Sequence, residues 1–133
     1  MRQAIIPDAL KQAAAATGFS PAIRAGDFLF LTGATGGRAD GTMPDDAADQ
    51  TRVALDKVQT VLVAAGAGEG DVVEMTSYHL DIANTFAAVQ GALEQIFAPP
   101  LPAWTAVEVA GLRRPGALVE FRVVAHAPEA RAP

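Results

Sequence analysis

One carboxylate in the last predicted strand is well placed to do chemistry. Residues 117–126 (ALVEFRVVAH) are rich in β-forming residues, and the alternation of a strand places Glu120 on one face with Leu118, Arg122 and Val124. A carboxylate among apolar neighbours is unfavourable unless it is paired or used, and such a group suits general acid or base catalysis. The structural alternative is a salt bridge to Arg122 or to an arginine of a neighbouring subunit.

Other candidate positions carry polar or aromatic groups, and most of them have a structural as well as a functional interpretation. Trp104, the single tryptophan, can form the wall of a pocket or fill the core. Thr32 and Gly33 follow a predicted strand and offer a hydroxyl group and backbone amides. Gln90 lies off the apolar stripe of a predicted helix and is either a binding residue or a solvated polar position. His79 is either a catalytic base or a histidine with satisfied hydrogen bonds.

Composition excludes several kinds of site. The chain has no cysteine and only two histidines, far apart in sequence, so thiolate chemistry is excluded and we expect no metal. The net charge is -5 and the basic residues are scattered, which argues against a nucleic-acid partner. No uncharged apolar run approaches the ~20 residues that span a bilayer, and the first residues do not resemble a secretory signal. We therefore expect a cytoplasmic protein with no membrane partner.

The elements that position these residues alternate between strands and helices within one domain. A chain of 133 residues, of which 50% are hydrophobic, fits a single domain with a sizeable core. Periodicity and turn residues predict strands over 22–25, 28–32, 72–80, 104–110 and 117–126, and helices over 8–16, 46–65 and 85–97, the last with Asn84 as its N-cap. This order predicts an α+β fold with the two longer helices on one face of a sheet. The strands are apolar on both sides, so we expect further copies of the chain to cover the other face.

Four stretches of sequence occur in a recognisable order. They are 19–33 (FSPAIRAGDFLFLTG), 64–66 (AAG) leading to 71–73 (DVV), 102–109 (PAWTAVEV), and Val119-Glu120. In this order and spacing they resemble the Rid family, the reactive intermediate deaminases once called YjgF and also labelled endoribonuclease L-PSP.

The resemblance implies a chorismate-mutase-like, YjgF-type fold with a mixed sheet and two helices on one face. It further implies a barrel-like homotrimer with small-molecule clefts between subunits, and it implies that no cofactor is needed. The resemblance divides the chain into an N-terminal extension with a possible short helix (1–17), a Rid-like domain (18–126) and a flexible tail (127–133).

The same resemblance assigns roles to individual residues. Glu120 matches the glutamate that positions water in active family members, which makes it the candidate catalytic residue. Phe19 stands at a tyrosine position of the family, and Thr32 and Gly33 match the strand end beside the substrate. Gln90 falls where many relatives carry a polar amide.

The sequence departs from the family pattern at the residue after Pro-Ala. Active relatives carry an arginine there that holds the substrate carboxylate, whereas this chain has Trp104 and so resembles an arginine-lacking subgroup. Ala106, on the same strand face as Trp104, completes the candidate substrate-binding set. An indole cannot replace a guanidinium in a bidentate contact with a carboxylate, so we expect deamination of aminoacrylate-type substrates to be weak.

Two functions are consistent with these residues. The first is cofactor-free hydrolysis of an imine, an enamine or a related small molecule, with Glu120 directing water. The second is a non-catalytic module that holds a metabolite in the same cleft. The acidic net charge of the chain argues against the older endoribonuclease label.

Overall fold

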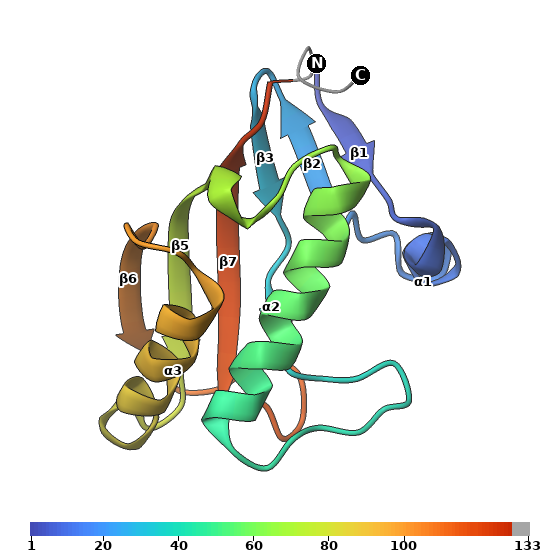
Figure 1. Ribbon diagram of the computed structural model, residues 1–133. Coiled ribbons are helices and arrows are strands. Elements are labelled where there is room, and N and C mark those ends of the chain that lie inside the picture. The colour runs from blue at the N-terminus through green and yellow to red at the C-terminus, as the bar shows by residue number, and fades with distance from the viewer. Residues whose placement is uncertain (129–133) are drawn as a thin grey trace.

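The last strand of the chain occupies the middle of the sheet. The strands are β1 (Gln3–Ile5), β2 (Ala22–Ala25), β3 (Phe28–Leu31), β4 (Ala34–Thr35), β5 (Val72–His79), β6 (Ala103–Glu108) and β7 (Val119–His126). In the computed structural model, which describes residues 1–128, β7 pairs with β3 and β4 on one side and with β5 on the other (Figure 1). The order is β1-β2-β3-β7-β5-β6, with β6 parallel to β5 and the other pairs antiparallel. The sheet is therefore mixed.

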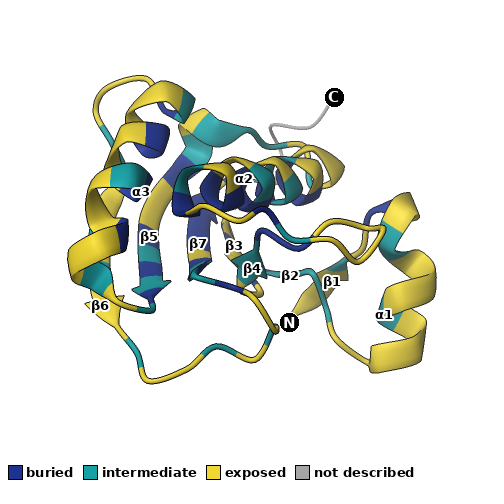
Figure 2. Ribbon diagram, turned by 90° about the horizontal axis from the view of Figure 1, so that it is seen from below, coloured by how far each residue is buried: buried dark blue, intermediate teal, exposed yellow. Residues whose placement is uncertain are grey.

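Both long helices lie on the same face of this sheet. Helices α2 (Ala47–Ala64) and α3 (Ile82–Ile96) lie across it in Figure 1, and the view from below shows buried positions on both helices beside the strands (Figure 2). The carboxylate of Asp46 caps α2 by accepting a hydrogen bond of 2.7 Å from the Asp49 N–H. The predicted pair of helices on one sheet face is confirmed.

Alternation along β7 separates the covered face of the sheet from the open one. Val119, Phe121, Val123 and Ala125 are all 0% exposed and belong to the hydrophobic core. Of the intervening residues, Glu120, Arg122 and His126 are half-buried or exposed, and Val124 is the exception at 9% exposure. Because the side-chain period of a strand is two, the core assignment of this strand follows from the sequence alone.

The face opposite the helices exposes large apolar side chains in the single chain. Phe28 and Phe30 on β3 are each 41% exposed, and Val107 on β6 is 37% exposed. The expectation that β3 is covered on both sides therefore holds for one side only within one subunit, where Leu29 and Leu31 are buried. Association through the open face stays a prediction.

Helix α3 begins earlier than the sequence predicts. Its N-cap is Asp81, in the left-handed region at φ 52°, and the predicted cap Asn84 instead lies in the first turn, where its amide donates to the Asp81 carboxylate at 2.7 Å. The carboxylate of Glu108 at the end of β6 accepts a hydrogen bond of 3.0 Å from the Ile82 N–H. This contact comes from a distant strand, and local sequence does not reveal it.

The shortest elements were not predicted, except for the first helix. Helix α1 (Lys11–Thr17) follows a 3-10 turn over Asp8–Leu10 and overlaps the predicted range of 8–16, with its last residue one position later and Gly18 in the left-handed conformation after it. A second 3-10 turn, Glu69–Asp71, precedes β5. Strands β1 and β4 have only three and two residues, which is too short for an alternation pattern.

The predicted flexible tail over 127–133 lies outside the described residues from 129 onward. Its first residue is fixed, because Ala127 is 1% exposed and its N–H donates to the Asp27 carbonyl at 2.8 Å. The guanidinium of Arg24 donates to the Ala127 carbonyl and, at 3.0 Å, to that of Ala65. Arg24 is therefore occupied by backbone carbonyls.

Candidate functional site

An offset in the strand pairing positions Glu120. With Phe30 opposite Val124, a regular antiparallel ladder would place residue 34 opposite residue 120, but residue 35 occupies that position. One extra residue on the β3–β4 side, as in a β-bulge, accounts for this offset. The extra length lies where Thr32 and Gly33 connect the two strands.

Gly33 makes room for the Glu120 carboxylate. A Cβ atom on Gly33 would lie 2.3 Å from Oε2 of Glu120, so only glycine allows the carboxylate its present place against the backbone. Within residues 1–128, Glu120 forms no ion pair, and the predicted alternative of a salt bridge to Arg122 is not present. The carboxylate is half-buried beside a break in regular pairing, a common place for a functional side chain.

The strand end with Thr32 and Gly33 opens into a pocket of about 830 Å³ between α1, β3 and α2. Three of the predicted site residues, Phe19, Thr32 and Gly33, line it. The Thr32 hydroxyl donates to the Ser20 carbonyl at 2.6 Å, and the Phe19 ring is 56% exposed. The guanidinium of Arg113 lies 5.6 Å from the centre of the Phe19 ring, within the range of a cation–π contact.

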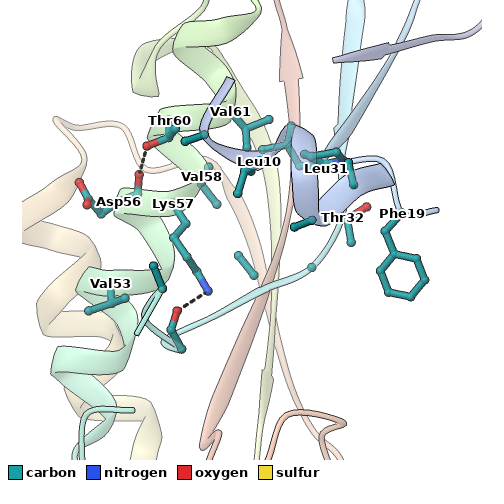
Figure 3. A pocket seen from close by; sticks show the side chains of 18 of the residues that line it. Leu10, Phe19, Leu31, Thr32, Val53, Asp56, Lys57, Val58, Thr60 and Val61 are labelled. Carbon is teal, nitrogen blue, oxygen red and sulfur yellow. Dashed lines mark hydrogen bonds between the residues drawn. The ribbon is translucent and has the colours of Figure 1, made fainter. Parts of the chain in front are cut away.

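The far side of the pocket contains two cations that the sequence analysis did not identify. Lys57, on α2, donates to the Gly37 carbonyl at 2.9 Å, and Figure 3 shows it on the opposite side of the pocket from Phe19. Burial and the nearby Arg114 lower the pKa of Lys57 below its usual range. The Arg114 guanidinium packs on Gly37, where a Cβ would lie 2.6 Å from Cζ. No local motif marks these two residues, because they lie far apart in sequence.

Trp104 lies on the other face of the sheet from Glu120. The pairing of β5 with β6 puts Trp104 beside Met75, which is 1% exposed and packs under the helices. The indole stacks on Phe86 of α3, with ring centres 5.1 Å apart and an interplanar angle of 2°. Glu120 pairs with Tyr78. Tyr78 lies three residues after Met75 on β5, so its side chain and that of Glu120 lie on the opposite face of the sheet. A single chain therefore separates the predicted arginine position from the predicted catalytic residue.

Trp104 begins a buried hydrogen-bond chain. Its Nε1–H donates to Ser77 Oγ at 2.8 Å, Ser77 Oγ lies 2.7 Å from Nε2 of His79, and His79 Nδ1 lies 2.9 Å from Thr85 Oγ1. Thr85 Oγ1 in turn lies 3.3 Å from the Asp81 carbonyl. Donors and acceptors match along this chain when Ser77 donates to Nε2 and a neutral His79 donates through Nδ1.

Burial lowers the pKa of His79, in agreement with a neutral ring. Its side chain is 0% exposed, so it is a satisfied core histidine and not a candidate base. The sequence indicated part of this series of hydrogen bonds, because Ser77 and His79 are two residues apart on a predicted strand and therefore lie on the same face.

The remaining predicted binding residues lie outside the pocket at the strand end. Ala106 pairs with Ser77 and is half-buried, and Gln90 is exposed on α3. The candidate residues thus form two sets. The bulge set comprises Phe19, Thr32, Gly33 and Glu120, and the indole set comprises Trp104, Ala106 and Gln90.

Metal and membrane features are not apparent in the described residues. Within residues 1–128, no group of three or more His, Asp or Glu side chains is arranged to hold a metal ion. In the same part of the chain, no helix is long and apolar enough to cross a membrane.

Fold and site together define a small α+β protein in which a carboxylate lies against a glycine beside the central strand. Known proteins share the fold. The family model described as Endoribonuclease L-PSP matches residues 9–127. The RutC family protein YjgH of Escherichia coli (strain K12) is 40% identical over 129 residues, which is 96% of this chain and 97% of YjgH. The chain belongs to the endoribonuclease L-PSP family, also known as the YjgF or Rid family.

Solved structures and a named enzyme extend the comparison. The structure of protein YJGH matches with a TM-score of 0.85 and 40% identity over 96% of this chain and 97% of that one. The Rid-family protein YyfA from Yersinia pestis matches with a TM-score of 0.82 and 28% identity over 96% of this chain and 100% of that one. The 2-iminobutanoate/2-iminopropanoate deaminase of Escherichia coli (strain K12) is 40% identical over 75 residues, 54% of this chain and 58% of the enzyme.

Proposed function

We propose that this protein hydrolyses the C–N bond of an imine, an enamine or a related small molecule, with Glu120 as the general base. The observation that carries the proposal is the half-buried Glu120 carboxylate, held against Gly33 at the strand end without an ion-pair partner in residues 1–128. A relative named as an imine deaminase supports the reaction class.

The reaction needs only water and a carboxylate. Glu120 accepts a proton from water as the water oxygen bonds to the imine carbon, and it passes this proton to the nitrogen to give a carbinolamine. The regenerated carboxylate then removes the hydroxyl proton as the carbonyl forms and passes it to the departing nitrogen. The C–N bond breaks, a carbonyl compound and ammonia leave, and Glu120 is again a carboxylate. No cofactor enters the balance.

The cleft is proposed to form between subunits of a homotrimer. Two observations support this: Glu120 and Trp104 lie on different faces of the sheet in one chain, and Phe28 and Phe30 leave the open face apolar. A second subunit can bring the indole set of one chain to the bulge set of another. Light scattering at micromolar concentration should give the mass of a trimer, and a stable monomer would contradict the proposal.

The direct test is an assay on a panel of imines generated in situ by amine oxidases and by an amino-acid oxidase, with ammonia release as the readout. For at least one imine that is not a 2-imino acid, we expect release above the uncatalysed rate with the wild type and none above that rate with Glu120→Gln. Equal release by both proteins would show that Glu120 is not the base.

A non-catalytic metabolite-binding module is the second candidate function. The loss of the arginine at position 104 and the large apolar pocket favour it. A ligand that binds in the cleft with no turnover over a broad panel of imines would favour this second function.

A further inference from the structure

Lys57 and Arg114 are the half-buried cations among residues 1–128, whereas the third cation that lines the pocket, Arg38, is exposed. Arg52 pairs with Asp49 at 2.6 Å and Lys11 pairs with Asp8 at 2.8 Å, both on the surface. Lys57 and Arg114 are both half-buried, and within residues 1–128 neither forms an ion pair. Both lie at Gly37, where Lys57 donates to the carbonyl at 2.9 Å and the Arg114 guanidinium packs on the Cα side.

Such an arrangement is unfavourable in the empty protein. Like charges in a partly desolvated place repel each other, and each loses some of its hydration. The chain nevertheless brings them together, because Gly37 has no side chain and the Arg114 guanidinium occupies the place that a Cβ would take. An anion between the two cations would offset both the repulsion and the desolvation.

The middle of the pocket is apolar, although Asp56 and Arg38 also line the pocket, and Glu120 itself does not line it. Leu10, Leu31, Val58 and Val61 line it between the cations and the strand end, and Figure 3 shows them grouped around the cavity. Gly33, which holds Glu120, also lines the pocket. The pocket thus joins a cationic end, an apolar middle and the glycine beside Glu120.

We propose that Lys57 and Arg114 form an oxyanion-binding subsite that takes the terminal carboxylate or phosphate of a small molecule with an apolar body. For the substrate, this inference rests on the proposed hydrolytic function. It assigns to the protein imines whose anionic group is several bonds away from the C=N bond. In 2-imino acids the carboxylate is adjacent to C=N, so they do not belong to this proposed class.

Binding of unreactive anions tests the subsite independently of catalysis. Hexanoate, its neutral analogue hexanol and inorganic phosphate are titrated into the protein by calorimetry or followed by amide chemical shifts. We expect hexanoate to bind and Lys57→Met and Arg114→Gln each to weaken it about tenfold or more. The matched control Arg52→Gln removes the same charge from the same helix as Lys57 and should leave hexanoate binding unchanged.

Several outcomes would overturn the subsite. Hexanol binding as tightly as hexanoate would show that the cations do not take part, as would unchanged binding in both variants. Failure of the wild type to bind either hexanoate or phosphate would do the same. Binding of phosphate alone would limit the site to a free inorganic ion and overturn the apolar-body class.

Stability and mass separate this proposal from a structural role. The Arg114→Gln variant should melt at or above the wild-type temperature, because it relieves like-charge repulsion and breaks no ion pair in residues 1–128. A clear drop in melting temperature, or a smaller oligomer by light scattering, would assign Arg114 to folding or assembly and overturn the subsite. If neutral imines are hydrolysed but hexanoate does not bind, the subsite fails and the proposed function stands.

Discussion

Polar side chains in two regions of the molecule, one beside α3 and one at the β3–β4 bulge, differ in whether they have partners. Beside α3, each link from Trp104 through Ser77 and His79 to Thr85 has a partner within 3.0 Å, and the histidine is buried and neutral. At the bulge, Glu120 has no ion-pair partner in the described residues, and the same is true of Lys57 and Arg114. Groups that complete each other's hydrogen bonds hold a structure together, whereas groups left incomplete are available to a ligand.

The substitution with the largest expected effect is at Glu120. Glu120→Gln keeps the shape of the side chain and removes its basicity, so turnover of any substrate should fall by about 10²–10⁴-fold. Because the carboxylate forms no ion pair within residues 1–128, the melting temperature should stay near that of the wild type. A variant that melts early but retains its turnover in the folded fraction would assign Glu120 to structure.

The second test compares Trp104 with the arginine of active relatives. Wild-type hydrolysis of 2-iminopropionate should be roughly 100-fold slower than that of an arginine-bearing relative, because no bidentate contact holds the carboxylate. Trp104→Arg should raise this rate and lower stability, since Ser77 loses its indole donor. Trp104→Phe, which keeps a ring on Phe86, is the control and should leave the rate low. Wild-type activity equal to that of the relative would refute this role of Trp104.

The third test removes one residue from the series of hydrogen bonds that begins at Trp104. Ser77→Ala leaves the Trp104 N–H and the buried Nε2 of His79 without their partner. The free energy of unfolding should fall by about 2 kcal/mol, which denaturant titration measures. Thr76→Ala, on the neighbouring half-buried position of the opposite face, is the control and should change stability less. Equal losses in the two variants would mean that the chain of hydrogen bonds adds no specific stability.

The fourth test moves the carboxylate without changing it. Gly33→Ala places a methyl group where Oε2 of Glu120 now lies, and the flexible glutamate side chain must turn aside. Turnover should fall about tenfold, because misplaced catalytic groups lose much of their effect, while stability changes little. Gly68→Ala, where a Cβ meets nothing within 4 Å, is the control. Full activity in Gly33→Ala would show that the position of the carboxylate is unimportant.

The smallest effect is the pH dependence contributed by His79. Its folded-state pKa is lowered from the ordinary value of 6.5 by burial, so the unfolded chain binds a proton first as the pH falls. The contribution of His79 to stability is therefore complete above pH 6.5 and declines below it, by at most about 1.4 kcal/mol per pH unit. Chemical denaturation at several pH values between 7.5 and 5 gives the free energy of unfolding as a function of pH. This free energy should fall less steeply with decreasing pH in His79→Gln than in the wild type. The exposed His126→Gln is the control, and an unchanged slope in His79→Gln would contradict the assignment.

Local patterns predicted most of the regular elements. The apolar stripe of α2 and the alternation of β7 are properties of short segments, and the structure has both. The start of α3 was wrong because Glu108 of a distant strand holds the Ile82 N–H. Alternation grouped Trp104 with Ala106 but gave no information on which sheet face they occupy, since that depends on how β5 and β6 pair.

The candidate site was predictable only in part for the same reason. The Rid resemblance identified Glu120, Thr32 and Gly33, and the structure places Gly33 against the carboxylate and Thr32 beside it. The approach of Arg114 to Lys57 depends on a loop that meets a helix far away in sequence. No periodicity within either segment encodes such a meeting.

The offset between β3 and β4 separates the function of this fold from its stability. Deleting one residue between positions 31 and 33 would let the ladder run on in register, with the strand uninterrupted from Phe28 to the end of β4. The core side chains of β7 would keep their places, but the space beside Gly33 that the Glu120 carboxylate occupies would close. One inserted residue thus distinguishes a sheet that only folds from a sheet that can also hold a reactive carboxylate. We expect proteins of this fold that lack the extra residue to have no catalytic activity at this position.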